Sequence, residues 1–412
     1  MTKKSDAPAI RFKGFSDAWE QRKAIDIADY SKGNGYSKGD LTDAGTPIIL
    51  YGRLYTKYQF AISEVDTFAV PRNGAVYSQG NEVIVPASGE TAEDIARASA
   101  VEKSGVMLGG DLNILRPFDF ISPLFLALTI SNGEPQKELA KKAQGKSVVH
   151  IHNTDIQEVT IAYPSRTEQD RIVSVFRQLD NLITLHQRKF EKLTNVKKSM
   201  LEKMFPQNGS SYPEIRFKGF TDPWEQRKLE DYLTVSAEKN TGNIYGRSDV
   251  LSVSGDYGIV NQIEFQGRSF AGASVSNYGV VQTGDVVYTK SPLNSNPYGI
   301  IKTNKGKPGI VSTLYAVYHP KENAFSDFIQ VYFEQHARMN NYMHPLVNKG
   351  AKNDMKVSAE NALKGPVCFP SRIEQESISA FFSVLDNLIT LHQRELEKLQ
   401  NIKKSMLEKM FV

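Results

Sequence analysis

Apolar residues recur every three or four positions through two long stretches of the chain, residues 164–205 and 370–411. Each stretch opens with Pro-Ser-Arg-x-Glu, in which Ser165 and Glu168, like their counterparts in the second stretch, have the spacing of a helix-capping box. No glycine or proline interrupts either run. The pattern predicts two helices with a heptad-like seam over about 33 residues, or roughly 50 Å. The predicted seam residues are Ile172, Phe176, Leu179, Ile183, Phe190 and Leu193 in the first helix, and Ile378, Phe382, Leu385, Ile389, Leu396 and Leu399 in the second.

One histidine interrupts each seam, His186 in the first helix and His392 at the equivalent position of the second. One interpretation places both at the solvent edge of the seam. The other uses symmetry: if the helices pack antiparallel about a pseudo-two-fold axis, His186 faces His392 and the polar pair fixes the register.

The rest of the chain has a different pattern. Short runs of Val, Ile, Tyr and Phe are separated by Gly, Pro and Asn, which predicts strands and turns. The predicted strands are residues 46–51, 82–85, 285–289 and 309–318, and short helical patterns occupy residues 123–131 and 325–340. Both variable regions therefore read as α+β domains.

The chain is a tandem duplication, and its 412 residues are twice 206. Residues 8–27 match residues 213–232 at about 14 of 20 positions, and the two helical stretches match at about 30 of 42. The regions between keep only a weak alignment of apolar positions. We therefore expect two α+β recognition domains separated by an antiparallel coiled-coil spacer, in a circular arrangement in which the chain ends where the linker would begin again. The expected divisions are residues 1–163 and 213–369 for the domains (lead-in segments 8–27 and 213–232), 164–205 and 370–412 for the helices, and 206–212 for the linker.

Composition excludes several classes of protein. Hydrophobic residues make up 40% and charged residues 23%, as in an ordinary globular protein, and the single cysteine, Cys368, excludes a disulfide framework or a Cys-rich zinc module. The polar N-terminus has no signal-peptide pattern and no apolar run has the length of a membrane span, so we expect a cytoplasmic protein. The net charge of +4 permits binding to nucleic acid. It conceals a difference, because residues 28–163 are acidic overall and residues 233–369 are basic.

Motifs for catalysis are missing. Gly145-Lys146-Ser147 resembles the end of a phosphate-binding loop, but Ala140 stands where the first glycine is required. His150 and His152 point to opposite faces of an extended segment, which disfavours a metal site. The sequence therefore favours a chain with no catalytic activity and no cofactor or metal of its own.

The helical stretches carry a family resemblance. Each opens with Pro-Ser-Arg-x-Glu-Gln and contains Leu-Asp-Asn-Leu-Ile-Thr-Leu-His-Gln-Arg. With the phrases Leu-Gly-Gly-Asp-Leu at 108–112 and Pro-Tyr-Gly-Ile at 297–300, the whole chain resembles the specificity (S) subunits of type I restriction–modification enzymes.

That resemblance implies a non-catalytic subunit whose two target-recognition domains each read half of a bipartite, asymmetric site in double-stranded DNA. The helices would act as a ruler and as the docking surface for two modification (M) subunits, which use S-adenosylmethionine to methylate adenine at N6. Restriction (R) subunits would add an ATP- and Mg-dependent motor and nuclease. A coiled-coil scaffold with paired protein-binding domains is the alternative, and a self-sufficient nuclease or methyltransferase is disfavoured by the missing motifs.

Base edges in the major groove are read by Arg, Lys, Asn, Gln, Ser or Thr on loops. The DNA-binding candidates in the first domain are Ser88, Thr91, Arg97, Gln144, Lys146 and Ser147. Those in the second are Lys290, Ser291, Asn294, Asn296, Lys349, Lys352, Asn353 and Lys356. Trp19 and Trp224 are expected to anchor the lead-in segments, and the pairs Lys197-Lys198 and Lys403-Lys404 to lie on a solvated helix face or contact M subunits.

Overall fold

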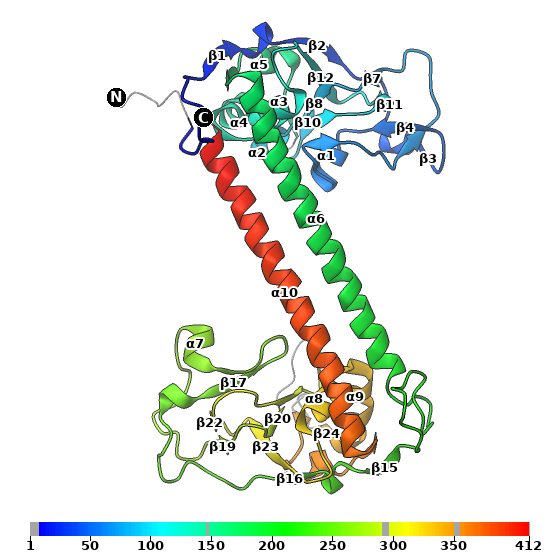
Figure 1. The fold of residues 1–412 in the computed structure, drawn as a ribbon, viewed down its shortest axis with the longest axis vertical. Helices are drawn as coiled ribbons and strands as arrows, with labels where there is room; N and C mark the ends of the chain where they lie inside the picture. Colours follow the sequence, from blue (N-terminus) through cyan, green and yellow to red (C-terminus); the bar gives the residue numbers. More distant parts are fainter. Residues whose placement is uncertain (1–7, 146–147, 291–295, 350–354, 412) are drawn as a thin grey trace. The chain divides into compact units, whose positions relative to one another are not determined.

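The computed structural model describes residues 8–145, 148–290, 296–349 and 355–411. The chain divides into two compact units, each described by itself: unit 1 comprises residues 1–187 and 394–412, and unit 2 comprises residues 188–393. Helices α6 (Arg166–Lys203) and α10 (Arg372–Met410) are both unbroken, which confirms the two long helices (Figure 1). Each unit therefore holds one α+β domain and half of each long helix.

The domain of unit 1 is built on two five-stranded sheets. The first has the order β2 (Ala28–Lys32), β12 (Leu112–Pro117), β8 (Glu82–Pro86), β10 (Ser99–Val101) and β5 (Ala61–Ile62), antiparallel except for the β10–β5 pair. The second has the order β3 (Leu41–Thr42), β6 (Phe68–Ala69), β4 (Thr46–Ile49), β11 (Ser104–Leu108) and β7 (Tyr77–Gln79). Smaller pairs are β1 (Glu20–Lys23) with β14 (Thr160–Tyr163), and β9 (Ser88–Gly89) with β13 (Val149–His150). The short helices are α1 (Arg53–Thr56), α2 (Ala92–Ile95), α3 (Pro123–Ile130), α4 (Gly133–Lys142) and α5 (Asn153–Gln157).

The domain of unit 2 has a smaller central sheet, with the order β16 (Leu233–Val235), β23 (Tyr315–Pro320), β20 (Val286–Thr289) and β21 (Ile301–Thr303). Two-stranded pairs surround it: β15 (Glu225–Lys228) with β26 (Pro366–Phe369), β17 (Leu251–Ser254) with β18 (Gly258–Asn261), β19 (Gly279–Val281) with β22 (Gly309–Val311), and β24 (Asn348–Lys349) with β25 (Met355–Lys356). The helices are α7 (Gln262–Gln266), α8 (Ser326–Glu334) and α9 (His336–Met343).

The two domains share one core motif, a central strand with a helix packed on it. Strand β8 pairs with β12 and β10 and carries α3, whereas β20 pairs with β23 and β21 and is contacted by α8. Each of the four predicted strand regions contains a strand. The predicted helix over 325–340 is wrong in one respect, because an extended backbone at Gln335 (φ −74°, ψ 115°) divides it into α8 and α9.

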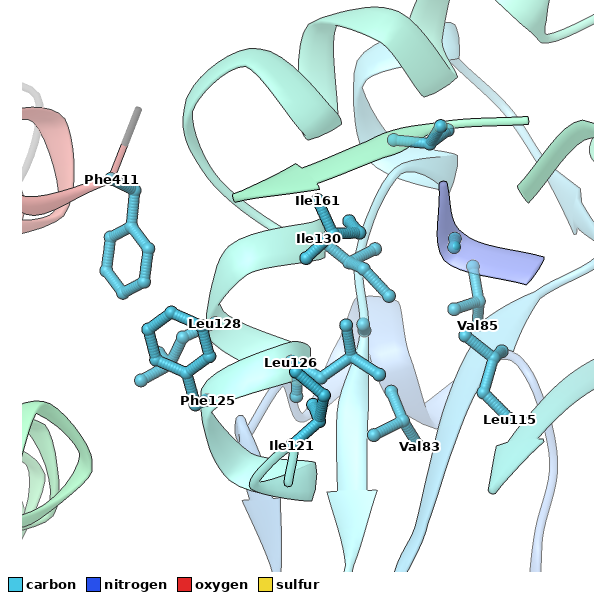
Figure 2. Packing of buried hydrophobic residues seen from close by; sticks show 14 of the residues in the cluster. Val83, Val85, Leu115, Ile121, Phe125, Leu126, Leu128, Ile130, Ile161 and Phe411 are labelled. Atoms are coloured by element: carbon cyan, nitrogen blue, oxygen red, sulfur yellow. The ribbon is translucent and has the colours of Figure 1, made fainter. Parts of the chain in front are cut away.

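The core of each domain is completed by the end of a helix from the other copy. In unit 1, the ring of Phe411, after α10, lies beside that of Phe125 (Figure 2), with centroids 5.9 Å apart. Phe411 also contacts Phe176, again at 5.9 Å. In unit 2, Phe205 after α6 contacts Phe328 at 5.8 Å and Phe382 at 6.1 Å. The tryptophan of each lead-in segment joins its cluster and is buried, Trp19 against Phe125 and Trp224 against both Phe205 and Phe328. This aromatic joint confirms the predicted anchoring role of the tryptophans.

Within each unit the two helix halves run antiparallel, as predicted. Asp180 pairs with Lys403 at 2.5 Å in unit 1, close to the contact between Phe176 and Phe411. Asp386 pairs with Lys197 at 2.6 Å in unit 2, close to the contact between Phe382 and Phe205. Lys197 and Lys403 are therefore partners in cross-helix ion pairs, so their expected place on a solvated face is wrong.

The predicted seam is most buried beside the domains. Five seam residues are buried, and the remaining apolar ones are half-buried. The buried ones are Ile172, Phe176, Ile378, Phe382 and Leu385, and the half-buried ones are Leu179, Ile183, Phe190, Leu193, Ile389, Leu396 and Leu399. His186 belongs to unit 1 and His392 to unit 2, so their pairing stays a prediction.

Candidate nucleic-acid and partner interfaces

The repeated Pro-Ser-Arg-x-Glu-Gln sequence forms a latch between each helix and its own domain. Glu168 is almost fully buried, and both of its carboxylate oxygens accept N–H groups of the Arg11 guanidinium at 2.7 Å. Gln169 accepts the backbone N–H of Ser122 at 2.8 Å and donates to the carbonyls of Phe120 and Pro164. The latch therefore fixes the lead-in segment, the helix start and the turn before α3 together.

Unit 2 repeats the latch residue by residue. Arg216 donates to both carboxylate oxygens of Glu374 at 2.7 and 2.8 Å. Gln375 accepts the backbone N–H of Phe325 and donates to the carbonyls of Asn323 and Pro370. Because the carboxylates and amides of both latches bind groups within the chain, the motif has a structural role.

In addition to the latch, each unit has ion pairs between its domain and its helices, and these ion pairs differ between the two units. In unit 2, Lys197 bridges Asp386 on α10 and Glu334 on α8, both at 2.6 Å. Burial lowers the pKa of Lys197, but the two carboxylates outweigh that effect and the pKa is raised. In unit 1, Arg177 on α6 pairs instead with Glu102, next to the end of β10.

The first-domain candidates gather at one corner of unit 1. Ser88 on β9 lies beside His150 on β13, with 3.2 Å between the serine Oγ and the imidazole Nδ1, and the backbones of Gln144 and His150 exchange hydrogen bonds of 3.2 and 2.8 Å. The structure therefore brings Ser88 and Gln144 together around His150, which the DNA-binding candidates did not include. Lys146 and Ser147 lie outside the described residues.

The other two candidates of this corner have structural partners. Thr91 caps α2, because its hydroxyl accepts the backbone N–H of Asp94 at 3.0 Å and donates to the Asp94 carboxylate. Arg97 forms an ion pair with Asp94 and lies 5.8 Å from the ring centroid of Tyr58. Their proposed contacts with DNA stay predictions.

Several cations of the first domain are ion-paired with carboxylates of the same domain. The pairs include Arg53 and Lys57 with Asp66, Arg72 with Asp40, Arg116 with Glu82, and Lys142 with Glu158. The Lys57 and Arg53 hydrogen bonds hold the pKa of Asp66 well below its usual range. Cations committed to such pairs contribute less to a phosphate-binding surface, which fits the acidic total of this domain.

Four of the second-domain candidates, Lys290, Asn296, Lys349 and Lys356, lie in the described part of unit 2. Lys290 is half-buried next to the end of β20, and burial followed by repulsion from Lys239 lowers its pKa. Lys349 and Lys356 lie on the β24–β25 pair, and the backbone carbonyl of Asn296 accepts the N–H of Gly299. Ser291, Asn294, Lys352 and Asn353 lie outside the described residues. Sequence reasoning missed Lys239, because its distance along the chain gives no sign that its charge acts on Lys290.

The glycine-containing phrases mark close backbone approaches. Gly299 has a left-handed φ of +76°, and a Cβ atom there would lie 2.0 Å from the carbonyl oxygen of Thr289. A Cβ at Gly109 would lie 2.7 Å from Leu50, and at Gly110 3.0 Å from the backbone nitrogen of Gly35. Gly299 therefore requires glycine, whereas Gly109 and Gly110 are tightly packed positions, so these phrases reflect the packing of the two domains.

Two further features are missing from the described residues, 8–145, 148–290, 296–349 and 355–411. There, no group of three or more His, Cys, Asp or Glu side chains is placed to hold a metal ion. Nor does any helix drawn from these ranges combine the length and apolar character that a membrane span requires.

Comparison with known proteins finds a matching family and similar proteins. The family described as type I restriction modification DNA specificity domain matches residues 16–195. The chain is 24% identical over 320 residues to the putative type I restriction enzyme MjaX specificity subunit of Methanocaldococcus jannaschii, covering 73% of this chain and 70% of that one. It is 21% identical over 349 residues to the MjaVIII specificity subunit of the same organism, covering 81% and 79%.

Among solved structures, the S subunit of a type I restriction–modification system from M. genitalium has a TM-score of 0.60 at 13% identity, over 98% of this chain and 99% of that one. At this identity, the structural similarity is evidence for the fold alone. The matched domain and the two relatives are evidence of similarity in sequence. With the repeated helices and latches, these matches show that the chain is similar to type I restriction–modification DNA specificity subunits, with the specificity domain itself matched over residues 16–195.

Proposed function

We propose that this chain is the non-catalytic sequence-recognition subunit of a type I restriction–modification complex. Each α+β domain reads one half of a bipartite DNA site through the major groove, and the α6–α10 pair sets the distance between the halves. Two copies of an adenine-N6 methyltransferase (M) subunit dock on the helices and supply S-adenosylmethionine chemistry. Restriction (R) subunits supply the ATP- and Mg-dependent activities.

The proposal rests on which parts of the two copies have stayed identical. From Leu179 and Leu385 onward the helices differ at only four positions over 27 residues, whereas the domains between them share only their apolar framework. Divergent loops are what two different half-sites require. Identical helices are what two copies of one partner require.

Packing inside the chain does not account for all of that identity. Leu182 and Leu185 of α6 are 43% and 46% exposed, and the equivalent Leu388 and Leu391 of α10 are 38% and 52% exposed. A leucine repeated at an exposed helix position is typical of a surface that another protein covers. We therefore assign the M-subunit docking to these exposed helix faces.

Adenine N6 is reached by flipping the base out of the duplex, which the M subunit does beside the bases that each domain reads. The corner around Ser88, Gln144 and His150 is the reading surface that we assign to the first domain. For the second domain, we assign the reading surface to Lys239, Lys290 and the β24–β25 pair.

Reconstitution with the M subunit of the same host tests the proposal. We expect a complex of two M subunits per chain that methylates a split site, and no methylation by either component alone. A Leu182→Asp/Leu388→Asp double variant should lose the M subunits, whereas the matched Ile244→Asp variant, which changes an 85% exposed residue of the second domain, should keep them. Methylation by the isolated chain, or no sequence dependence in the complex, would contradict the proposal. The latter would favour the protein-binding scaffold.

A further inference from the structure

Each unit presents one exposed face of its antiparallel helix halves, and the two faces are copies of each other. The unit-1 face consists of Leu182 and Leu185 from α6 with Glu395, Lys398 and Ile402 from α10. The unit-2 face consists of Leu388 and Leu391 from α10 with Lys189, Lys192 and Val196 from α6. Each residue of one face is the duplicate, 206 positions away, of a residue of the other.

The cross-helix ion pairs set which residues are neighbours on each face. In unit 1 the pairing of Asp180 with Lys403 puts Leu182 level with Ile402, and Leu185 level with Lys398. The pairing of Asp386 with Lys197 has the same consequence for unit 2. These residues lie at equal angles from the seam of their own helix, and in an antiparallel pair equal angles fall on the same side.

The two faces differ in charge at a single position. Lys189 of the unit-2 face is replaced by Glu395 in the unit-1 face, whereas the only other change, Val196 to Ile402, keeps the character of the side chain. Lys189 is exposed and Glu395 half-exposed, and neither forms an ion pair with another described residue. The charge difference is therefore available to whatever covers these faces.

The surroundings of this position indicate the chemistry of the partner. Both faces keep a lysine one helical turn further on, Lys192 and Lys398, and are flanked by an arginine, Arg188 and Arg394. None of these four cations is ion-paired with another residue in the described part of the chain. Cations repeated in both copies and unpaired within the chain fit a partner surface that is acidic at this point.

We propose that the two docking faces bind identical M subunits with unequal strength, the Lys189 face more tightly than the Glu395 face. The inference rests on the proposed function, because it takes the M subunit as the occupant of both faces. An acidic partner surface is attracted to three cations on the unit-2 face. On the unit-1 face it meets two cations and a carboxylate that repels it. The complex therefore assembles in order, with the unit-2 face filled first.

Hydrogen exchange of the full chain with half an equivalent of M subunit tests this order. In about 50 mM salt we expect the peptides of the unit-2 face to be protected about three- to tenfold more often than those of the unit-1 face, a bias that shrinks in about 0.5 M salt as the charges are screened. Glu395→Lys should equalise the two faces. The double variant Lys189→Glu/Glu395→Lys keeps the same total charge and should reverse the order.

Two results separate this inference from the proposed function. Equal protection of both faces in the natural chain, or a bias that the double variant leaves in place, overturns the unequal docking and leaves the M-subunit docking intact. A chain that binds no M subunit under any salt condition overturns both.

Discussion

The two units attach a domain to a helix pair by the same latch and the same aromatic joint, yet the space beside the joint differs. In unit 2, Glu334 reaches Lys197, and Arg338 lies over the rings of Phe205 and Tyr332 at 4.4 and 4.8 Å. In unit 1, a groove of about 740 Å³ lies between the domain and the helices, and the ion pair of Arg177 with Glu102 borders it. The comparison teaches that the duplicated sequence specifies the joint itself, whereas each domain adds its own lateral contacts.

The aromatic joint should give the largest effect when it is broken. Replacing Phe205 or Phe411 by Ala empties a buried site in its own unit, at a cost of about 3–5 kcal/mol. We expect Phe205→Ala to be the more costly, because Phe205 also contacts Tyr332 and Arg338, whereas Phe411 contacts two rings among the described residues. Hydrogen exchange at increasing denaturant concentrations measures the loss of stability of each unit in each variant. Equal losses would show that the extra contacts of unit 2 add nothing.

The latch should give equal effects in the two units, since its geometry is the same. Glu168→Gln and Glu374→Gln each remove one charge from a buried, two-point pair with arginine, which we expect to cost about 2–3 kcal/mol. The readout is the local opening free energy of the lead-in segment in hydrogen exchange. An effect confined to one unit would mean that the latch acts only together with the neighbouring lateral contacts.

Replacing the cross-helix lysines, Lys197 and Lys403, should destabilise the two units by different amounts, with a smaller loss than at the aromatic joint. Lys197→Met leaves two carboxylates without a partner and should cost about 1–3 kcal/mol, whereas Lys403→Met leaves one and should cost about 0.5–1 kcal/mol. Since the folded pKa of Lys197 is raised, its contribution is complete below the ordinary lysine pKa and is lost as pH rises through the folded value. Thermal unfolding of both variants between pH 8 and pH 11 checks the amount and its sign.

The smallest expected effect concerns DNA binding by the two domains. Lys290→Gln should weaken binding of the M-containing complex several-fold and reduce its salt dependence by about one phosphate contact. Arg97→Gln in the first domain should change the salt dependence less, because Asp94 already neutralises that guanidinium. Titrations of cognate DNA between 50 and 200 mM salt compare them. An equal loss from both variants would show that ion pairing within the first domain does not limit its contacts with DNA.

Sequence reasoning predicted the parts of the fold that depend on periodicity and duplication. The helices α6 and α10, their antiparallel halves and the buried tryptophans follow from repeated apolar spacing, which one sequence shows directly. For the latch, the sequence predicted only the spacing of a capping box. It does not show that Glu168 binds Arg11, which lies 157 residues away. The break at Gln335 carries no Gly or Pro signal and was missed.

The binding surfaces were predicted less well for a physical reason. Loop residues such as Thr91 and Arg97 have the right chemistry for DNA, but their neighbours decide whether that chemistry is available. Asp94 accepts a hydrogen bond from Thr91 and forms an ion pair with Arg97. Conversely, His150 gains its significance from its hydrogen bond with Ser88, and Lys239 from its charge repulsion of Lys290, and neither partner is near in sequence.

The most direct test of the account is an exchange of one domain. Residues 28–163 would be replaced by the equivalent region of another specificity subunit, in a complex with the M subunits, and N6-methyladenine would be mapped across the host genome. The account predicts that one half of the split methylation site changes while the other half and the spacing stay the same. A change in both halves, or in neither, would contradict the division of recognition between two independent domains.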